Sequence, residues 1–509
     1  MSIDACTPVV VGVGQAAERI DDPYYRAMSA VELAAAGARA ALDDCGADVA
    51  KVAAAIDTVA GVRQFEISGP AQPVLGKSNN YPRSVANRIG ADPARAILEV
   101  VGGQGPQHLI TELAGGIAAG QAEVVLIFGS DATSTTRYFA TADNRPDFTE
   151  TVEGSLEDRG YGIEGLISRY TVVHGLVDAP TQYALLENAR RAGTGLGPAD
   201  YLRRMGELFA PFSKVAADNP FAAAPVRRDV EELITVTESN RMISEPYPRL
   251  LVARDQVNQG AAALLMSVEA ARKLGVPEEN WVFLHGHADM EEQSLLERPD
   301  LGHAPSAVMA VREALAVAGI GIDDIATFDL YSCFPVPVFN ICDGMGIAPD
   351  DRRGLTLTGG LPFFGGAGNN YSMHGVAETV AQMRSRPGQF GVVGANGGIM
   401  SKYSVGVYSS TPVEWKADRS AELQAQIAAA PTVAVTEQAE GTGTVETYTV
   451  RRDNGRLTGI IIGRLTADDS RFLATTEDDD LIALLTEGDP LGQSVSVRSF
   501  DYGNRCTLS

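Results

Sequence analysis

The chain has 509 residues, 45% of them hydrophobic and 21% charged, which is the composition of a globular protein with room for several domains. Its formal net charge of -24 opposes non-specific attraction to nucleic acid or anionic membranes. No apolar run reaches membrane-spanning length, and residues 1–5 lack the order of a signal peptide, so we predict a cytoplasmic protein. The five cysteines are scattered, which predicts reduced thiols.

The first strand is predicted over Val9 to Ala17, an apolar run that contains Gly12 and Gly14. These glycines fit the dinucleotide pattern G-x-G-x-x-A, but that fingerprint needs a helix to begin at the glycines. Here a polar segment with Pro23 follows, and the first periodic helix begins only near Ser29. We therefore favour a buried strand that leads into a loop over a nucleotide site.

A strand, a glycine turn, a helix and a strand follow one another from Ile97 to Ser130, in the order ILEVVGGQGPQHLITELAGGIAAGQAEVVLIFGS. Two β-branched apolar runs flank a segment with apolar residues at helical spacing, which predicts a βαβ crossover. Such a unit places the Gly102 to Gly105 turn and the next helix N-terminus at the carboxyl end of a buried sheet. Amides exposed there suit an oxyanion or a phosphate.

The same layout returns between Leu355 and Gly398. The preceding segments match as well, because the alanine-rich helix of Ala30 to Asp43 leads into AAIDTVAG as Ala307 to Ala318 leads into IATFDLYS. We predict a duplicated α/β architecture of two halves. The glycine turns of both halves can then line one shared cleft.

Residues 131–246 depart from this rhythm and are predicted to be an insertion on the loop side of the first half, with helical pieces around Gln182 to Ala192 and Pro198 to Phe209. The β rhythm returns with QGAAALLMS from Gln259. Farther on, HGHAD from His285 to Asp289 alternates two histidines and an aspartate on one strand face, which could bind a metal. Without a further ligand cluster we favour a polar strand exit and expect no metal.

The C-terminal part changes character. Residues 414–440 are predicted to be a linker, and residues 441–509 a separate module with a hairpin turn at Asp453-Asn454-Gly455. Three strands, an acidic-capped helix and two strands are the order of an OB-type β-barrel. From Gly441 onward seven arginines and no lysine stand against eleven acidic residues, so we expect no nucleic-acid partner and predict a docking or covering role.

Residues 7–410 resemble the thiolase superfamily and are similar to its sterol-carrier-type (lipid-transfer) thiolases. FDLYSCF resembles their HDCF segment, GGLPFFGGAGNNYSMHG their GGLxxxGHPxGATG segment, and QGAAALL their DGAAA strand. The resemblance implies a duplicated thiolase fold, layered α/β/α/β/α, with halves at 1–275 and 276–413 and the insertion as the loop domain that holds CoA. It implies an acyltransferase of lipid metabolism that acts on acyl-CoA thioesters and has no other cofactor.

The departures from that family change the expected chemistry. Gly103 stands where the family has its nucleophilic cysteine, Gly366 where it has the GHP histidine, and Tyr331 where it has the HDCF histidine. Thioester attack needs an activated thiolate or an equivalent side chain. We therefore expect no ordinary thiolase activity, and we expect glycine at positions 103 and 366 to enlarge the pocket.

Three side chains remain as candidate catalytic residues: Cys333, which matches the HDCF cysteine, His374, eight residues beyond the GHP position, and Tyr331. Cys333 is either functional or a small buried side chain at a strand end. His374 is either a general base or a cap of its helix. The candidate CoA-binding residues, some of which can supply oxyanion-hole amides, are Gly103, Gly366, Asn396, Gly397 and Gly398.

Three interpretations remain open. The chain binds CoA or acyl-CoA without turnover, or catalyses a related retro-aldol cleavage with Cys333 and His374, or is a scaffold whose barrel docks a partner. Basic residues of the insertion are predicted to meet the CoA phosphates, namely Arg190, Arg191, Arg203 or Arg204. The family implies a homodimer, whereas a C-terminal module that covers the dimer face would leave a monomer.

Overall fold

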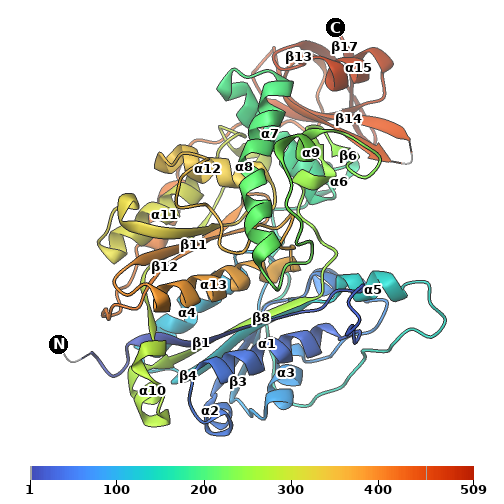
Figure 1. The fold of residues 1–509 in the computed structure, drawn as a ribbon. Helices are drawn as coiled ribbons and strands as arrows, with labels where there is room; N and C mark the ends of the chain where they lie inside the picture. The colour runs from blue at the N-terminus through green and yellow to red at the C-terminus, as the bar shows by residue number, and fades with distance from the viewer. Residues whose placement is uncertain (1–2, 454) are drawn as a thin grey trace.

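The structure is a computed structural model that describes residues 3–453 and 455–509. Its main body is a ten-stranded mixed sheet in the order β10-β11-β12-β9-β1-β8-β4-β2-β3-β5 (Figure 1). The strands are β1 (Pro8–Ala17), β2 (Thr58–Gly61), β3 (Arg95–Leu98), β4 (Val124–Asp131), β5 (Glu157–Asp158), β8 (Gln259–Ser267), β9 (Val282–Glu291), β10 (Ile325–Leu330), β11 (Phe390–Gly397) and β12 (Lys402–Ser409). Only two residue pairs join β1 to β9, so the sheet divides there into two halves.

Two crossover helices, α4 (Gly105–Ala118) and α13 (Tyr371–Ser385), lie between the halves of the sheet (Figure 1). Their apolar faces share one core cluster with inward-facing residues of β4, β8 and β11. The outer layers are α1 (Ala30–Asp44), α2 (Val49–Ala55) and α3 (Tyr81–Ile89) on the first half, and α11 (Pro305–Ala318) and α12 (Pro335–Met345) on the second. The predicted duplicated, five-layered fold is confirmed.

The glycines of the first strand serve packing between a helix and the sheet. A side chain at Gly12 would collide with the backbone of Ala41, and one at Gly14 with the backbone of Gly37, both on α1. Strand β1 continues past both glycines, and α1 begins only at Ala30 behind the capping box of Ser29. The G-x-G-x-x-A pattern is therefore explained by close approach of α1 to the sheet.

The insertion contains five helices and a hairpin: α5 (Thr133–Phe139), α6 (Arg169–Val173), α7 (Ala179–Thr194), α8 (Pro198–Asp218), α9 (Val230–Ile234), β6 (Met242–Ser244) and β7 (Tyr247–Pro248). Helix α7 has clear end signals. The side chain of Asp178 accepts a hydrogen bond from the Thr181 amide at its start, and Gly195 ends it with a φ of 70°. This helix reaches from the interior of the second half to the C-terminal barrel (Figure 1).

The C-terminal strands close into a barrel. Its elements are β13 (Gly441–Asp453), β14 (Arg456–Leu465), β15 (Arg471–Thr476), α15 (Asp479–Glu487), β16 (Ser494–Phe500) and β17 (Gly503–Leu508). The pairing order β13-β14-β15-β17-β16-β13, with β15 parallel to β17, is that of an OB barrel, as predicted. Asp453 pairs with Arg456 across the predicted hairpin, whose residue Asn454 lies outside the described residues.

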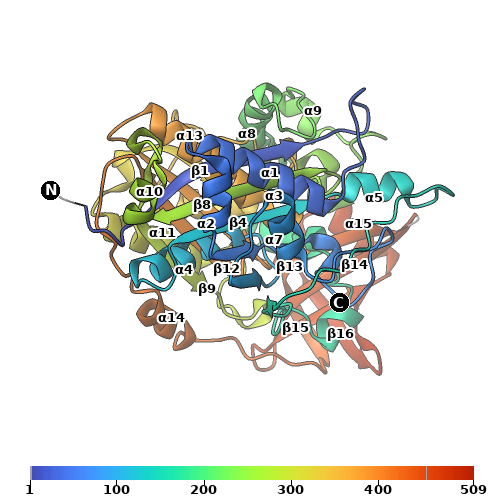
Figure 2. The same cartoon turned by 90° about the horizontal axis from the view of Figure 1, so that it is seen from below.

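The two histidines of HGHAD, on β9, form hydrogen bonds with the segment that follows β12. His285 Nε2 lies 2.7 Å from the Thr411 carbonyl oxygen, and His287 Nδ1 lies 2.8 Å from Asp418 Oδ2. Helix α14 (Ser420–Ala428) then packs beside β9, and the chain runs on to the barrel (Figure 2). The alternating pattern is thus the polar attachment of the linker to β9.

Across residues 3–453 and 455–509, no helix combines the length and apolar character needed to cross a membrane.

Candidate functional site

The glycine turns of the two halves meet at the N-termini of α4 and α13. The Gly102 amide, at a φ of 144°, donates to Asn369 Oδ1 at 3.0 Å, and the Ser372 hydroxyl donates to the Gly103 carbonyl oxygen at 2.8 Å. Side chains from the second turn therefore hold the backbone of the first. We call this junction the reaction centre, because Gly103 and Tyr331 stand where the thiolase superfamily has catalytic residues. It contains most of the candidate site residues predicted from the sequence.

Tyr331 occupies the space that a side chain at Gly103 would need. A Cβ at position 103 would collide with the Tyr331 hydroxyl and ring and would lie 2.6 Å from the Asn396 carbonyl oxygen. The Tyr331 ring is buried and packs edge-on against Tyr371 at 5.3 Å between centroids. The expected enlargement of the pocket at Gly103 is wrong, because the larger residue at one family position fills the volume vacated at another.

Cys333 is buried beside Tyr331, and its thiol is not activated. The Sγ atom lies 3.9 Å from Asn396 Nδ2, and burial raises the pKa of the Cys333 thiol to about 12. A thiol with that pKa stays protonated at neutral pH and is a poor nucleophile. The structure therefore favours the interpretation of Cys333 as a small buried side chain.

The segment from Asn396 to Gly398 is held by Tyr183, which comes from α7 and was not identified from the sequence. Its hydroxyl accepts from Asn396 Nδ2 at 2.8 Å and donates to the Gly398 carbonyl oxygen at 2.9 Å, while its ring stacks on Phe334 at 4.4 Å. No motif marks this tyrosine. The only signal was its position in a helical insertion segment.

Gln104 was also not assigned a role, although it lies between the two candidate amides. A Cβ on Gly397 would lie 3.2 Å from the Gly103 nitrogen, so these residues are neighbours, but it would collide with Gln104 Oε1. That oxygen is buried and has no hydrogen-bond partner among the described residues. The Gln104 side chain thus takes the space beside Gly103 and Gly397.

His374 lies on the first turn of α13 but faces away from the reaction centre. Its Nδ1 is 2.7 Å from Gln15 Oε1 on β1, and its ring packs against Phe364 at 5.0 Å. Burial lowers the pKa of His374 to about 3, so the ring is neutral. No hydrogen bond joins it to Cys333 in the described chain. The structure gathers Tyr331, Cys333, Gly103 and the Asn396 segment, but it separates His374 from them.

Gly366 lies apart from this group as well. A Cβ there would be 3.3 Å from the Arg254 carbonyl oxygen and 3.3 Å from Leu361 Cδ2, so it packs against the segment that enters β8. Its amide donates to the Arg254 carbonyl oxygen at 2.8 Å. The expectation of a pocket widened by glycine at position 366 is wrong, because neighbouring chain fills this place too.

The arginines predicted to meet CoA phosphates are paired within the protein. Arg190 is 8% exposed and binds Asp343 at 2.8 Å, and Arg191 is 2% exposed and binds Asp489 of the barrel at 2.8 Å. Arg203 and Arg204 are more exposed, but each also lies beside a glutamate. The expectation is wrong for Arg190 and Arg191, since a buried guanidinium that leaves its carboxylate pays the full desolvation penalty.

The barrel docks through the strands that OB barrels often use to bind ligands. Ile460, Ile462 and Leu473 of β14 and β15 are fully buried and belong to the core cluster of the second half and the insertion. Arg471, fully buried, donates to the Leu296 carbonyl oxygen at 2.7 Å and pairs with Glu446. This face is therefore occupied by the chain itself.

A charged group surrounds the outer side of α4. Glu99, His108 and Glu112 have ligand atoms close enough together to hold a metal. Arg159, however, bonds Glu99 at 2.7 Å and Glu112 at 2.6 Å, and nearby carboxylates raise the pKa of His108 to about 9. A cationic imidazole and a guanidinium already neutralise these carboxylates, so the group behaves as an ion-pair network.

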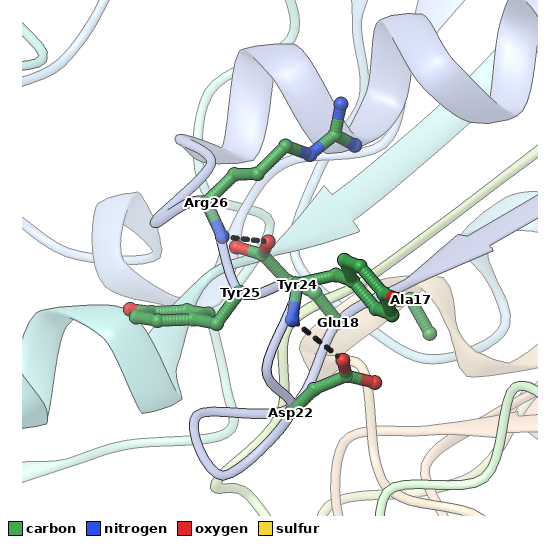
Figure 3. Close-up of a pocket in the computed structure, with 6 residues that line it drawn as sticks. All are labelled: Ala17, Glu18, Asp22, Tyr24, Tyr25 and Arg26. Carbon is green, nitrogen blue, oxygen red and sulfur yellow. Dashed lines mark hydrogen bonds between the residues drawn. The ribbon is translucent and has the colours of Figure 1, made fainter.

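A surface cavity of about 630 Å³ lies at the loop after β1 (Figure 3). It is lined by Ala17, Glu18, Asp22, Tyr24, Tyr25 and Arg26. Both carboxylates face backbone amides of the same loop, since Asp22 Oδ1 accepts from the Tyr24 amide at 2.8 Å and Glu18 Oε2 from the Arg26 amide at 3.0 Å (Figure 3). These groups shape the loop, and the cavity contains none of the residues predicted from the sequence.

Known proteins with similar sequence or structure share this architecture. Residues 422–501 match the model of the thiolase-like protein type 1 additional C-terminal domain. The dimeric peroxisomal thiolase of Saccharomyces cerevisiae is 13% identical with a TM-score of 0.57, and covers 80% of this chain and 98% of its own. An Ltp2-ChsH2(DUF35) aldolase is 20% identical with a TM-score of 0.56, and covers 79% and 98%. These two likenesses show the fold alone.

The curated proteins gave no match. A solved structure gives a much stronger result: a monomeric SCP2-thiolase like protein type 1 from Mycobacterium smegmatis is 60% identical, with a TM-score of 0.87, and the match covers 100% of both chains. The glycine turns, the insertion and the C-terminal barrel are therefore shared over the full length. The chain belongs to the family of SCP2-thiolase-like proteins of type 1.

Proposed function

We propose that this protein binds CoA or acyl-CoA thioesters and does not carry out thiolase chemistry. The observation that carries the second part is the position of Tyr331, whose hydroxyl and ring fill the space in which the side chain of a nucleophile at position 103 would lie. Covalent thioester chemistry needs that side chain and an adjacent base. Neither is offered by Gly103 and a neutral phenol.

Binding rests on the backbone of the reaction centre. Gly103 and Gly397 remain neighbours at the N-terminus of α4, where amides and the helix dipole favour an oxyanion or a polarised carbonyl oxygen. The Gln104 side chain occupies this space in the free protein, and its Oε1 has no hydrogen-bond partner among the described residues. A thioester oxygen can therefore replace Gln104 Oε1 when that side chain rotates away.

The retro-aldol alternative with Cys333 and His374 fits less well. It requires a thiol and a base that act on the same bond, whereas His374 is hydrogen-bonded to Gln15 on β1 and, among the described residues, has no hydrogen bond to Cys333. The scaffold alternative needs a surface of the barrel that is open to a partner. Phe500 and Tyr502, at the β16–β17 turn, offer such a surface, since they are 58% and 74% exposed. We therefore favour binding without turnover, because it needs the backbone amides of the reaction centre and neither a nucleophile nor a base.

We also propose that the chain is a monomer. Strand β5 pairs with β3 at the edge of the first half and places Glu157 and Asp158 along that edge. Charged side chains on an edge strand oppose pairing with a second molecule. Light scattering after size exclusion tests this, and a dimer whose formation survives dilution would contradict it.

Calorimetry with CoA and with acetyl-CoA tests binding. Saturable heat with the wild type, lost in Gly103→Trp, is expected, since the indole would block the reaction centre. A matched control is Gly193→Trp, because nothing lies near a Cβ at that position on α7. No saturable heat in the wild type, or equal heat in the Gly103 variant, overturns the site.

Intact-mass measurement after incubation with acetoacetyl-CoA tests the absence of thiolase chemistry. We expect no mass increase on the protein and no release of free CoA. An acyl adduct on any residue of the 98–130 stretch would contradict the proposal, whereas binding without an adduct supports both parts of it.

A further inference from the structure

A layer of buried polar side chains lies behind the reaction centre, between α13 and the inner face of the first half. Its members are 1% exposed or less and come from three elements: Asp131 on β4, Gln259 on β8, and Asn370 and His374 at the start of α13. Each has at least one side-chain nitrogen or oxygen without a hydrogen-bond partner among the described residues. Buried polar atoms without a hydrogen-bond partner are rare in folded proteins, which suggests that a further group binds to this layer.

The strand register brings these groups together. Asp131 is the direct cross-strand partner of Gln259, which places their side chains on one face with Cβ atoms about 5 Å apart. The neighbouring pair on the same face is Gly129 and Ala261, and Asn370 lies over Gly129. The space that a side chain at Gly129 would need is taken by Asn370, whose Oδ1 would collide with a Cβ at that position.

One loop closes the layer from above. Asp131 Oδ2 lies against the Cα of Gly368, and a Cβ on Gly365 would be 2.8 Å from Gln259 Oε1. Both glycines belong to the loop that leads to Asn370 at the start of α13. The oxygens of Asp131 and Gln259 therefore lie against the segment 365–370, which itself carries Asn370.

The hydrogen-bond roles of three of these groups are fixed by their other contacts. Gln259 Nε2 donates to the carbonyl oxygens of Phe221 and Phe364, both at 2.9 Å, so its Oε1 is the atom left over. Gln15 Nε2 donates to Glu378, so Gln15 Oε1 accepts from His374 Nδ1 and leaves His374 Nε2 as an acceptor. Asp131 Oδ1 accepts from the Phe65 amide, which leaves Oδ2.

With Asp131 ionised, the layer offers four acceptors, namely Asp131 Oδ2, Gln259 Oε1, Asn370 Oδ1 and His374 Nε2, against one donor group, the Asn370 amide nitrogen. Burial and the neighbouring Glu66 raise the pKa of the Asp131 carboxyl well above its usual value, and no basic side chain is paired with it in the described chain. A guest that only donates and carries positive charge would satisfy the acceptors and favour the ionised form of Asp131.

We propose that this acceptor layer is a binding site for a small monovalent cation, either ammonium or potassium. A single carboxylate matches one positive charge, whereas divalent calcium and magnesium prefer more carboxylate and water oxygens. Ammonium donates four N–H groups and suits an imidazole nitrogen among the ligands, while potassium uses the three oxygens. The residue of this layer's surroundings nearest to solvent is Phe65, which is 55% exposed, donates its amide to Asp131 and has its Cβ beside Gly368.

Thermal unfolding of the full chain in ammonium, potassium and rubidium chloride, each compared with choline chloride at equal ionic strength, tests the site. We expect the melting temperature to rise by at least about 1 °C over choline with one or more of these ions, because a ligand of the folded state stabilises it. The order of ammonium against potassium identifies the ion. Equal melting temperatures in all four salts overturn the proposal.

Asp131→Asn should remove the ion-specific rise while keeping the shape of the side chain. The matched control is Asp329→Asn, since Asp329 is equally buried but its Oδ2 accepts from the amides of Leu357 and Thr358 at 2.9 and 3.0 Å. That control should keep the rise. The double variant Asp131→Asn with Gln259→Glu returns a carboxylate to the layer and should restore it.

Anomalous diffraction from wild-type crystals soaked in rubidium chloride gives a readout that does not depend on any variant. A rubidium peak bounded by Asp131, Gln259 and Asn370 supports the proposal. Ordered water without a rubidium peak, or a peak elsewhere only, overturns it. None of these outcomes depends on whether the protein binds CoA.

Discussion

Helix α7 contacts two regions that are built in contrasting ways. At one end, Tyr183 reaches the reaction centre, where every contact is neutral: a phenol, a thiol, two amide side chains and glycine backbone. At the other end, the buried Arg191 pairs with Asp489 of the barrel, and within the barrel the fully buried Arg471 pairs with Glu446, whose side chain is 24% exposed. The reaction centre is thus packed with neutral groups, while buried guanidinium groups lie where the barrel docks.

This contrast has an energetic consequence. Neutral packing tolerates substitution at the cost of contacts or a cavity, whereas a buried charge that loses its partner is strongly destabilising. Substitutions at the barrel interface should therefore cost more stability than substitutions at the reaction centre.

The largest effect is expected for Arg471→Met. The change leaves Glu446 without its partner and two backbone carbonyl groups, of Leu296 and Arg298, without their donor. Breaking a buried ion pair from one side typically costs about 3–5 kcal/mol, and we expect the lower end of that range because Glu446 is 24% exposed. Denaturant unfolding should show this loss and a separate early transition for the barrel. Arg456→Met on the neighbouring strand is the control, because its pair with Glu477 is exposed and should matter little.

A single cooperative transition with wild-type stability in Arg471→Met would contradict the contrast. It would mean that apolar residues of β14 and β15 alone hold the barrel in place.

The second prediction concerns Glu187, midway along α7. Its carboxylate accepts from the hydroxyls of Tyr201 and Tyr247 and from the Val336 amide, and burial raises the pKa of Glu187 from 4.5 to about 7. Because the pKa is raised in the folded state, the contribution of Glu187 to the stability of the fold is fully present below pH 4.5 and is lost as the pH rises through 7. The loss is on the order of 3 kcal/mol.

Glu187→Gln removes this titration. The free energy of unfolding of the wild type minus that of the variant should therefore decrease between pH 4 and pH 8, by about 3 kcal/mol. The wild type thus loses stability relative to the variant as the pH rises. Urea unfolding across that range measures it. A difference that is flat with pH would show that Glu187 is ionised at no cost.

Several of these features were accessible from the sequence, and the reason is that they are local. The glycine turn before α4 and the order of strands and helix in the barrel each depend on residues close together in the chain. Register and periodicity then fix which faces are buried. The duplicated halves and the barrel were therefore readable from these patterns, whereas the layered fold and the departures at Gly103 and Tyr331 came from the resemblance to the thiolase superfamily.

The content of the reaction centre was not readable, because it depends on contacts between distant segments. The sequence shows a glycine at position 103 and a tyrosine at position 331, but not that one fills the space of the other. His374 was placed on the correct helix, yet the side on which its ring lies is set by Gln15 on β1. Arg190 likewise gave no sign of its distant partner Asp343.

The third prediction tests the filled reaction centre directly. Gly103→Ala introduces a Cβ where the Tyr331 ring lies, and such overpacking typically costs about 1–3 kcal/mol. Tyr331→Leu shortens the opposing side chain, so the double variant should be more stable than the sum of the two single effects predicts. Chemical unfolding of the four proteins gives the coupling energy. Strict additivity would show that the two positions do not compete for space.

The smallest expected effect is on binding, in Gln104→Ala. In the free protein the Gln104 amide lies between Gly103 and Gly397, so a thioester must displace it before the backbone amides are available. Removing the side chain removes that rearrangement, which should tighten the dissociation constant for acetyl-CoA by roughly threefold to tenfold. Gln107→Ala is the matched control, since Gln107 lies one turn along α4 and accepts from the Tyr408 hydroxyl at 2.6 Å, away from the amides. It should lose stability without gaining affinity. If Gln104→Ala binds no more tightly than wild type, while the Gly103→Trp variant still loses binding, then the ligand reaches the reaction centre by a path that leaves Gln104 in place.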